Sequence, residues 1–304
     1  MSRVKKRFKM KELKRFWKVA GLLLVILSGV STLSFGEEKE SKETKKIQDN
    51  SFLIEEAYNQ EPGVIQHIQT FQYMKDGTWG YTFTQEWPIK GQTHQFSYTI
   101  PVSHLTDPGR TGMGDVALNY RYQLINKGWI ALAPRFSLLL PTGKFKRDLG
   151  RGSLGYQTNI PLSLELSDKW VTHWNLGATF TPHRKGPDGG KANAFDLNAG
   201  ASIIYLLSEN LNLMLEAVWN SNQSVEADGK RKRDHTFFIN PGIRYAIDFK
   251  SGLQIVPGVG FPIGVGPSRN EYGVFLYLSF EHPLFKQKEL SAQEKKGDNG
   301  MESQ

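Results

Sequence analysis

The sequence predicts an all-β protein, an antiparallel transmembrane β-barrel of about 12 strands. From Val64 onward, apolar residues recur at every second position, which is the period of a strand with one apolar face. The alternating runs extend over about 9 to 12 residues, the length of a tilted membrane-spanning strand, whereas soluble sandwiches use strands of about 5 to 6. The opposite face carries many charged side chains, which a water-filled lumen accommodates and a packed soluble core does not.

The N-terminus carries an export signal. Residues 1–36 hold nine basic residues and one acid, followed by an apolar stretch at 19–30 and the small residues Ser34 and Gly36. The apolar stretch is shorter than the roughly 20 residues of a spanning helix, so the pattern predicts a cleaved signal peptide rather than an uncleaved anchor. The net charge of +8 therefore belongs to this segment. Because the chain leaves the cytoplasm, we expect no nucleic-acid partner.

The mature chain divides by composition into four parts. Residues 37–50 are a charged linker, 51–63 an N-terminal segment, 64–285 the outer-membrane barrel and 286–304 a flexible polar tail. The absence of cysteine excludes a disulfide framework, a thiolate metal site and a lipid-modified N-terminal cysteine.

The alternation places the strands in order along the chain. The first six are expected at 64–73, 79–89, 96–102, 116–124, 130–140 and 160–166, and six more begin near Trp170, Phe195, Leu211, Phe237, Leu253 and Tyr272. Four prolines interrupt these strands, where a missing N–H favours a bulge or a slip in register. They are Pro134, Pro161, Pro241 and Pro257.

The connections alternate in predicted length. Tight turns are expected near 90–93, 126–128, 167–169, 208–210 and 248–252, and long loops near 103–113, 143–153, 183–193 and 221–234. Short periplasmic turns and longer extracellular loops are typical of outer-membrane barrels. Aromatic residues lie beside the tight turns, as expected of an interfacial girdle. They are Trp87, Tyr122, Trp129, Trp170, Tyr205 and Tyr245.

The polar rows of the strands supply candidate lumen residues. A barrel of twelve strands predicts a narrow pore whose charges set its selectivity. The candidates are Glu86, Asp115, Arg121, Arg135, Glu165, Glu216 and Arg244.

The N-terminal segment supplies a second set of candidates. Phe52, Leu53 and Ile54 should avoid water, while Glu55 and Glu56 can meet lumen arginines. Two interpretations stay open: a plug within the lumen or across the periplasmic mouth, and a periplasmic helix resting on the barrel rim.

The chain shows no arrangement typical of catalysis. His94 and His173 lie in or beside predicted strands, and the pair Asp234–His235 lies at a loop edge without an ordered third partner. No ligand spacing indicates a metal. We therefore expect no enzyme activity, no metal and no cofactor. The long loops near 143–153, 183–193 and 221–234 hold 11 basic and 5 acidic residues, which either attract lipopolysaccharide phosphates and anionic solutes or form a solvated rim.

Several segments resemble the MetA-pathway of phenol degradation family of outer-membrane transporters. They are the run FLIEEAYNQEPG at 52–63, the Gly114–Asp115 pair that opens a strand ending at Leu124, and the strand exit at 134–143. The closing run at 271–280 looks like the strand signal that the barrel assembly machinery recognises, although 24 residues follow Phe280.

The resemblance implies passive uptake of small compounds, hydrophobic or aromatic ones among them, across the bacterial outer membrane. The alternative is a non-transporting surface barrel whose basic extracellular loops carry an adhesion or structural role. The expected partners are outer-membrane lipid and lipopolysaccharide, the barrel assembly machinery and a small-molecule solute.

Overall fold

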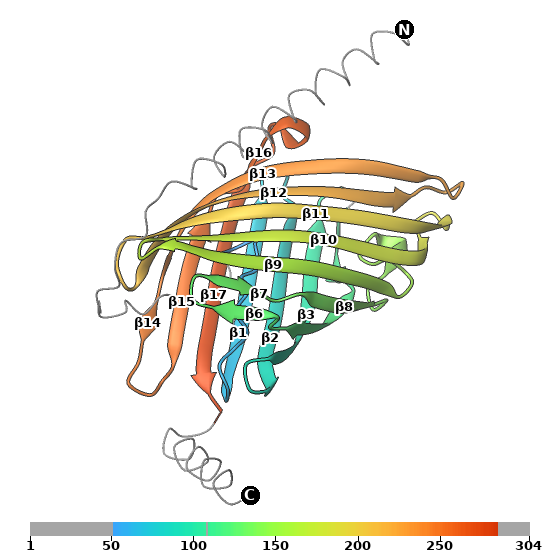
Figure 1. The fold of residues 1–304 in the computed structure, drawn as a ribbon. Helices are drawn as coiled ribbons and strands as arrows, with labels where there is room; N and C mark the ends of the chain where they lie inside the picture. The colour runs from blue at the N-terminus through green and yellow to red at the C-terminus, as the bar shows by residue number, and fades with distance from the viewer. Residues whose placement is uncertain (1–50, 108, 285–304) are drawn as a thin grey trace, which may run out of the picture. The chain divides into compact units, whose positions relative to one another are not determined.

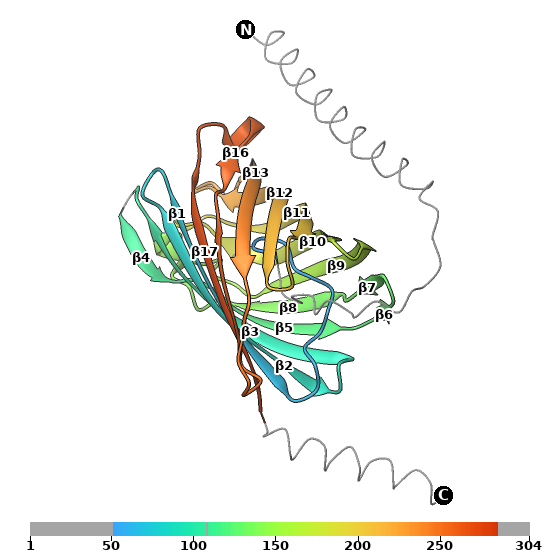
Figure 2. The same cartoon turned by 90° about the vertical axis from the view of Figure 1, so that its left-hand side faces the viewer.

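The computed structural model describes residues 51–107 and 109–284; the expected signal peptide, linker and polar tail lie outside this part of the chain. The described residues form one antiparallel sheet that closes on itself, because β1 pairs with both β2 and β17. Figures 1 and 2 show the strands curving around a common axis. The predicted twelve-strand antiparallel barrel is confirmed.

Eight of the twelve spans are single strands. They are β1 (Val64–Met74), β2 (Trp79–Lys90), β3 (His94–Leu105), β9 (Gly155–Ser167), β10 (Trp170–Lys185), β11 (Lys191–Leu206), β12 (Leu211–Val225) and β17 (Gly273–Pro283). Four spans are interrupted. They consist of β4 (Arg110–Met113), β5 (Val116–Tyr122) and β6 (Ile125–Lys127); β7 (Ile130–Leu132) and β8 (Arg135–Leu140); β13 (Arg231–Tyr245) and β14 (Ile247–Asp248); and β15 (Gln254–Gly260) and β16 (Ile263–Gly264).

The prolines do not shift the inward and outward rows, and Pro161, Pro241 and Pro257 lie within β9, β13 and β15. Pro134 lies at the break between β7 and β8, and its carbonyl still accepts a hydrogen bond of 3.0 Å from the N–H of Tyr122. On either side of Pro241, Asn240 and Arg244 are both buried on the inner face. The missing proline N–H is therefore accommodated locally, and the alternation expected from the sequence continues through these sites.

The connections lie on two rims. The terminal rim, where the chain enters and leaves the barrel, carries tight turns at 91–93, 128–129, 168–169, 207–210 and 249–253. The opposite loop rim carries connections at 75–78, 106–109, 141–154, 186–190, 226–230 and 265–272.

Three of the four predicted long loops are paired strands for most of their length. The connections expected at 103–113, 183–193 and 221–234 shrink to four or five residues. Arg231, for example, pairs with Val225. The prediction was wrong because side chains beyond the bilayer meet water on both faces, so backbone pairing continues without an apolar row. Only the connection at 141–154, with the short 3-10 helix Phe145–Arg147, is long as expected.

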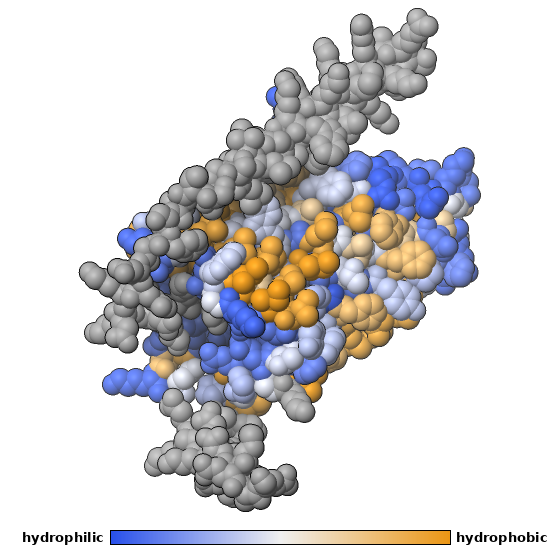
Figure 3. All heavy atoms as spheres, viewed as in Figure 1, coloured by the Kyte–Doolittle hydropathy of each residue, from blue (hydrophilic) through white to orange (hydrophobic). Residues whose placement is uncertain are grey.

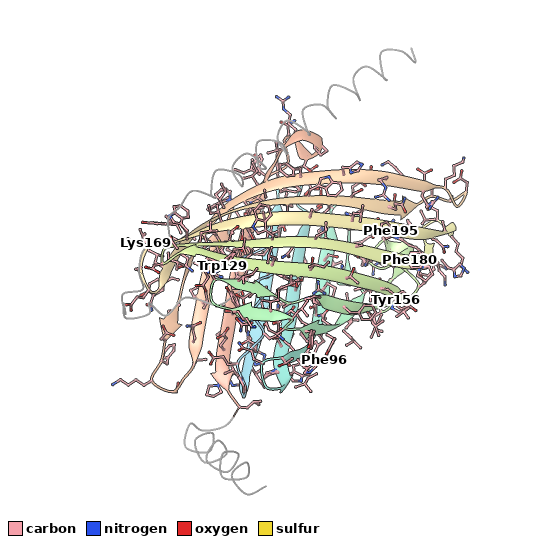
Figure 4. The ribbon with its side chains drawn as sticks, in the orientation of Figure 1. Phe96, Trp129, Tyr156, Lys169, Phe180 and Phe195 are labelled. Atoms are coloured by element: carbon pink, nitrogen blue, oxygen red, sulfur yellow. The ribbon has the colours of Figure 1, made fainter. Side chains whose placement is uncertain are left out.

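The outer wall of the barrel is apolar. Leu176, Ile160 and Leu215 are 60%, 47% and 47% exposed, and Figure 3 shows a hydrophobic band across the strands with polar residues toward the ends of β12 and β13. Aromatic side chains such as Trp129 and Phe180 project from the wall toward opposite rims in Figure 4. This exposed apolar belt faces lipid, as in outer-membrane barrels. No helix in the described ranges has the length and hydropathy to cross a membrane.

Candidate functional site

The N-terminal segment, residues 51–60, lies inside the barrel. Every one of these side chains is buried except those of Leu53 and Glu55, which are partly buried, and the stretch contains no helix. The segment precedes β1, whose start marks the terminal rim, and turns back among the strands (Figure 2). The segment contacts strands on all sides of the barrel wall. The candidate site is therefore the lumen together with residues 51–60.

Glu216 of β12 binds the first turn of the N-terminal segment. Its Oε1 accepts hydrogen bonds from the backbone N–H groups of Phe52 and Leu53, both at 2.8 Å, and of Ile54 at 3.2 Å. Its Oε2 accepts one from Asn240 Nδ2 at 2.6 Å. Three converging N–H groups meet one carboxyl oxygen much as in backbone anion sites, so the segment supplies hydrogen-bond donors to the buried side chain of Glu216.

The ring of Phe52 occupies a recess formed by inward-facing glycines. A Cβ atom on Gly242 would lie 2.3 Å from Phe52 Cε2, and one on Gly258 would lie 2.5 Å from Phe52 Cε1. On its other side the ring packs against Phe275 and Tyr277, with centroid separations of 5.6 and 5.5 Å. Glycine is required here because only a missing side chain lets the ring approach the strand backbone.

The apolar side chains near Phe52 form a core inside the barrel. This cluster includes Phe52, Ile68, Val171, Ile204, Leu206, Met214, Ala246, Val256, Phe275 and Tyr277. Most of these residues lie in the parts of their strands nearest the terminal rim. Phe52 of the N-terminal segment therefore packs into an apolar core with wall side chains inside the barrel.

Glu55 and Asn175 fix the middle of the segment. Arg135 donates hydrogen bonds from Nε and Nη2 to the two carboxylate oxygens of Glu55 at 3.0 and 2.6 Å. Asn175 accepts from the N–H of Glu55 at 2.9 Å and donates to its carbonyl at 2.8 Å. Burial raises the pKa of Glu55, but the charge and hydrogen bonds of Arg135 lower it by more, so its pKa lies below the ordinary value.

Arg121 binds the last part of the segment. Its guanidinium donates to Asn59 Oδ1 at 2.8 Å and to the carbonyl of Tyr58 at 2.6 Å, and it lies 3.7 Å from Glu86. Burial, reinforced by the charges of Glu165 and Glu56, raises the pKa of Tyr58. Its hydroxyl is therefore protonated and donates to Glu165 Oε1 at 3.4 Å.

Asp115 does not face the N-terminal segment. Its two oxygens accept hydrogen bonds from the N–H of Gly143 at 3.0 Å and of Arg151 at 2.7 Å, and so hold the 141–154 loop against the inner wall. Arg244 is buried deep in the lumen. Two of the candidate wall residues, Arg121 and Glu86, approach each other to 3.7 Å. Glu216, Arg135 and Arg121 thus bind the N-terminal segment, and Asp115 binds the 141–154 loop.

A cavity of about 200 Å³ lies on the loop-rim side of the segment. Its wall is almost entirely polar. The lining residues are Leu53, Glu55, Arg135, Arg151, Gln157, Asn159, Asn175, Thr179, Asp196, Leu197, Asn198, Asn220 and Asn222. The lumen is thus polar on the loop-rim side of the segment and apolar around Phe52.

The buried histidine anchors the segment. His173 Nδ1 and Ser163 Oγ lie 2.7 Å apart, and the same Oγ accepts the N–H of Ala57 at 2.8 Å. Both side chains are buried, so the pair positions backbone rather than presenting a nucleophile to solvent. No group of three His, Asp or Glu side chains with metal-binding geometry occurs between residues 51 and 284, Pro108 aside.

Sequence reasoning missed the glycine recess and the carboxamides. Gly200, Gly242 and Gly258 occupy inward rows, where a barrel strand would ordinarily place a side chain. A glycine at an inward-facing position of a strand is the sequence feature that could have indicated the recess. The asparagines of β10, β11 and β12 that line the cavity lie in the same inward rows. Because their side chains are uncharged, the pattern of charged lumen residues does not indicate them.

The sequence matches one family model, and the fold resembles solved β-barrel structures. The family model described as "Putative MetA-pathway of phenol degradation" matches residues 63–272. An outer membrane channel from Pseudomonas putida F1 aligns with 15% identity and a TM-score of 0.55, covering 74% of this chain and 97% of that one. The NanC porin aligns with 9% identity and a TM-score of 0.49, covering 72% and 100%. The likeness to the channel is one of fold. No curated protein sequence matches the chain.

Proposed function

Because the chain belongs to the MetA-pathway of phenol degradation family, we propose that it is a passive outer-membrane channel for small molecules, aromatic ones among them, whose lumen is closed at rest by its own N-terminal segment. The observation that carries the proposal is the combination of a polar cavity on the loop-rim side of the lumen and a segment packed inside the barrel. A solid barrel would need no wet cavity, and an open pore would contain no such segment.

The contacts of the segment suit a removable closure. Five wall side chains each accept a hydrogen bond from a backbone N–H group of the segment. They are Glu216, Asn175, Ser163, Gln123 and Gln95. The segment adds no strand to the sheet and is joined to it by no covalent bond other than the chain itself. Its displacement would therefore open the lumen while leaving the barrel ladder intact.

The alternative of a surface barrel with adhesive loops has weaker support. At the loop rim, 186–190 and 226–230 are tight connections, and Lys230 and Lys232 pair with Asp228 and Asp234. This local pairing leaves less free positive charge than the composition implied. Lipopolysaccharide contacts and recognition of β17 by the assembly machinery fit the proposal as partners of any such barrel.

Liposome swelling with the purified full chain tests the proposal. Small uncharged solutes should enter liposomes that contain the protein faster than protein-free liposomes, with a sharp decline as solute size rises, because a narrow barrel admits only small molecules. Swelling equal to that of protein-free liposomes for every solute, with a barrel shown to be folded by its heat-dependent gel mobility, would contradict a channel.

A further inference from the structure

The cavity above the N-terminal segment is small and has no excess charge. Its volume of about 200 Å³ lies below the roughly 300 to 1,000 Å³ of pockets for drug-sized ligands, so it admits only a small molecule. It is lined by two arginines, Arg135 and Arg151, and two acids, Glu55 and Asp196.

Each of these charges is already paired. Arg135 binds Glu55, and Arg151 lies 3.8 Å from Asp196 and 3.9 Å from Asp115. Arg184 approaches Asp196 from the other side at 3.6 Å. A charged solute would have to break or crowd these pairs, so the cavity offers no advantage to an ion over a neutral molecule.

The carboxamides of the cavity are not fully paired. The side chains of Asn198 and Asn222 form no hydrogen bond to any other described residue that the structure records, and Asn159 Oδ1 is a buried acceptor without a partner. Arg151 Nε is likewise a buried donor without one. Asn159 as a whole is only 4% exposed. Buried polar groups are usually satisfied, so residues with unpaired polar groups around one cavity point to a ligand that can donate and accept hydrogen bonds.

Hydroxyl groups match this lining. A carboxamide offers both a donor and an acceptor, and a hydroxyl likewise donates once and accepts twice. Leu53 and Leu197 are the only apolar residues among those that line the cavity. An apolar molecule would leave carboxamides of the lining, such as that of Asn198, without hydrogen-bond partners, which is the basis on which polar sites reject analogues that lack a hydroxyl.

We propose that this cavity binds small uncharged solutes carrying two or more hydroxyl groups. The proposal rests on the channel function and names the solute class that the lumen selects. The shared chemistry can come from a polyol or from a dihydroxybenzene, for which Leu53 offers contact with the ring.

Equilibrium binding to the folded full chain in detergent, measured by saturation-transfer NMR and titration calorimetry, tests the proposal. The probes are ribitol and catechol, with toluene and benzoate as controls. We expect ribitol, catechol or both to bind, and toluene and benzoate to bind at least tenfold more weakly. Binding of ribitol alone identifies a polyol site, and binding of catechol alone identifies an aromatic diol site.

Variants assign the binding to the cavity. Asn198→Leu combined with Asn222→Leu should weaken binding about tenfold, because it removes two hydrogen-bonding groups. Asn222→Leu alone, at an exposed position, should weaken it about threefold, whereas Asn126→Leu in the terminal rim should have no effect. Absence of binding by both diols, equal binding of toluene, or binding unchanged in the double variant would overturn the proposal. Diol binding without solute swelling would uphold the site and remove the channel.

Discussion

Glu55 of the N-terminal segment and Arg135 of β8 form a two-point ion pair inside the lumen, with donor–acceptor distances of 2.6 and 3.0 Å. Their side chains are 27% and 16% exposed, so water screens the pair only in part. Because one partner lies on the segment and the other on the wall, the pair links the N-terminal segment to the barrel wall. It also relieves the repulsion between Arg135 and Arg121, which lie directly opposite in the ladder.

Removing the charge of Glu55 should loosen the segment. Glu55→Gln leaves Arg135 without its carboxylate, and losing a charged hydrogen-bonding partner costs about 1.5 to 3 kcal/mol. We expect the fraction of time that single channels spend open in planar bilayers to rise about tenfold or more. Glu209→Gln, in an exposed turn of the terminal rim, is the matched control and should leave the open fraction unchanged. An unchanged open fraction in Glu55→Gln would show that this pair does not hold the segment.

The same pair predicts a response to acid. The pKa of Glu55 is lowered below its ordinary value of 4.5, so the ion pair stabilises the closed state fully above that value and is lost as pH falls through the lower folded-state pKa. Current through the full chain should therefore be constant from neutral pH to about 4.5 and rise only in stronger acid. The rise should be absent in Glu55→Gln. A rise centred near neutral pH would contradict the assignment.

The recess around Phe52 predicts an effect of a single methyl group. In Gly258→Ala the new Cβ would lie 2.5 Å from Phe52 Cε1, and such overpacking costs about 1 to 3 kcal/mol. The open fraction should rise, and it should not rise further when Gly258→Ala is added to Phe52→Ala. Gly80→Ala, where no atom lies within 4 Å, should behave like the parent. Additive effects of the two substitutions would rule out the recess.

Asp115 should control the folding of the 141–154 loop rather than solute selectivity. Asp115→Ala removes the acceptor for the N–H groups of Gly143 and Arg151, so the loop should open locally more often. We expect trypsin to cleave within the loop about tenfold faster, as measured by mass spectrometry of the fragments. Asp228→Ala, in the 226–230 hairpin, should leave the rate of cleavage in this loop unaltered. Equal rates in all three proteins would contradict the role of Asp115.

The alternation of residues predicts the barrel well because its cause is local. A strand in a barrel wall must turn every second side chain to lipid. The outward orientation of Leu176 and Ile160 can therefore be predicted from the local sequence alone. The inward rows that contain Arg121, Arg135 and Glu216 follow by default. Loop lengths fail for a related reason: beyond the bilayer the alternation ceases to be imposed, although the strands continue.

The contacts inside the lumen could not be predicted from the sequence. Glu55 and Arg135 are 80 residues apart, and which arginine Glu55 meets depends on how far the segment enters the barrel. The three N–H groups on Glu216 depend on the backbone direction at Phe52, which no residue pattern specifies. Sequence alone thus identifies the charged groups of the site, whereas the fold determines which of them bind the N-terminal segment.

The conductance of the barrel with and without the N-terminal segment tests the central claim most directly. A chain lacking residues 37–62 behind the export signal should form a folded barrel, as judged by heat-dependent gel mobility, and should pass a steady stepwise current in planar bilayers. The full chain should remain closed for most of the recording if residues 51–60, which are buried or partly buried inside the barrel, close the lumen as proposed. Equal currents through the two proteins would contradict closure of the lumen by this segment.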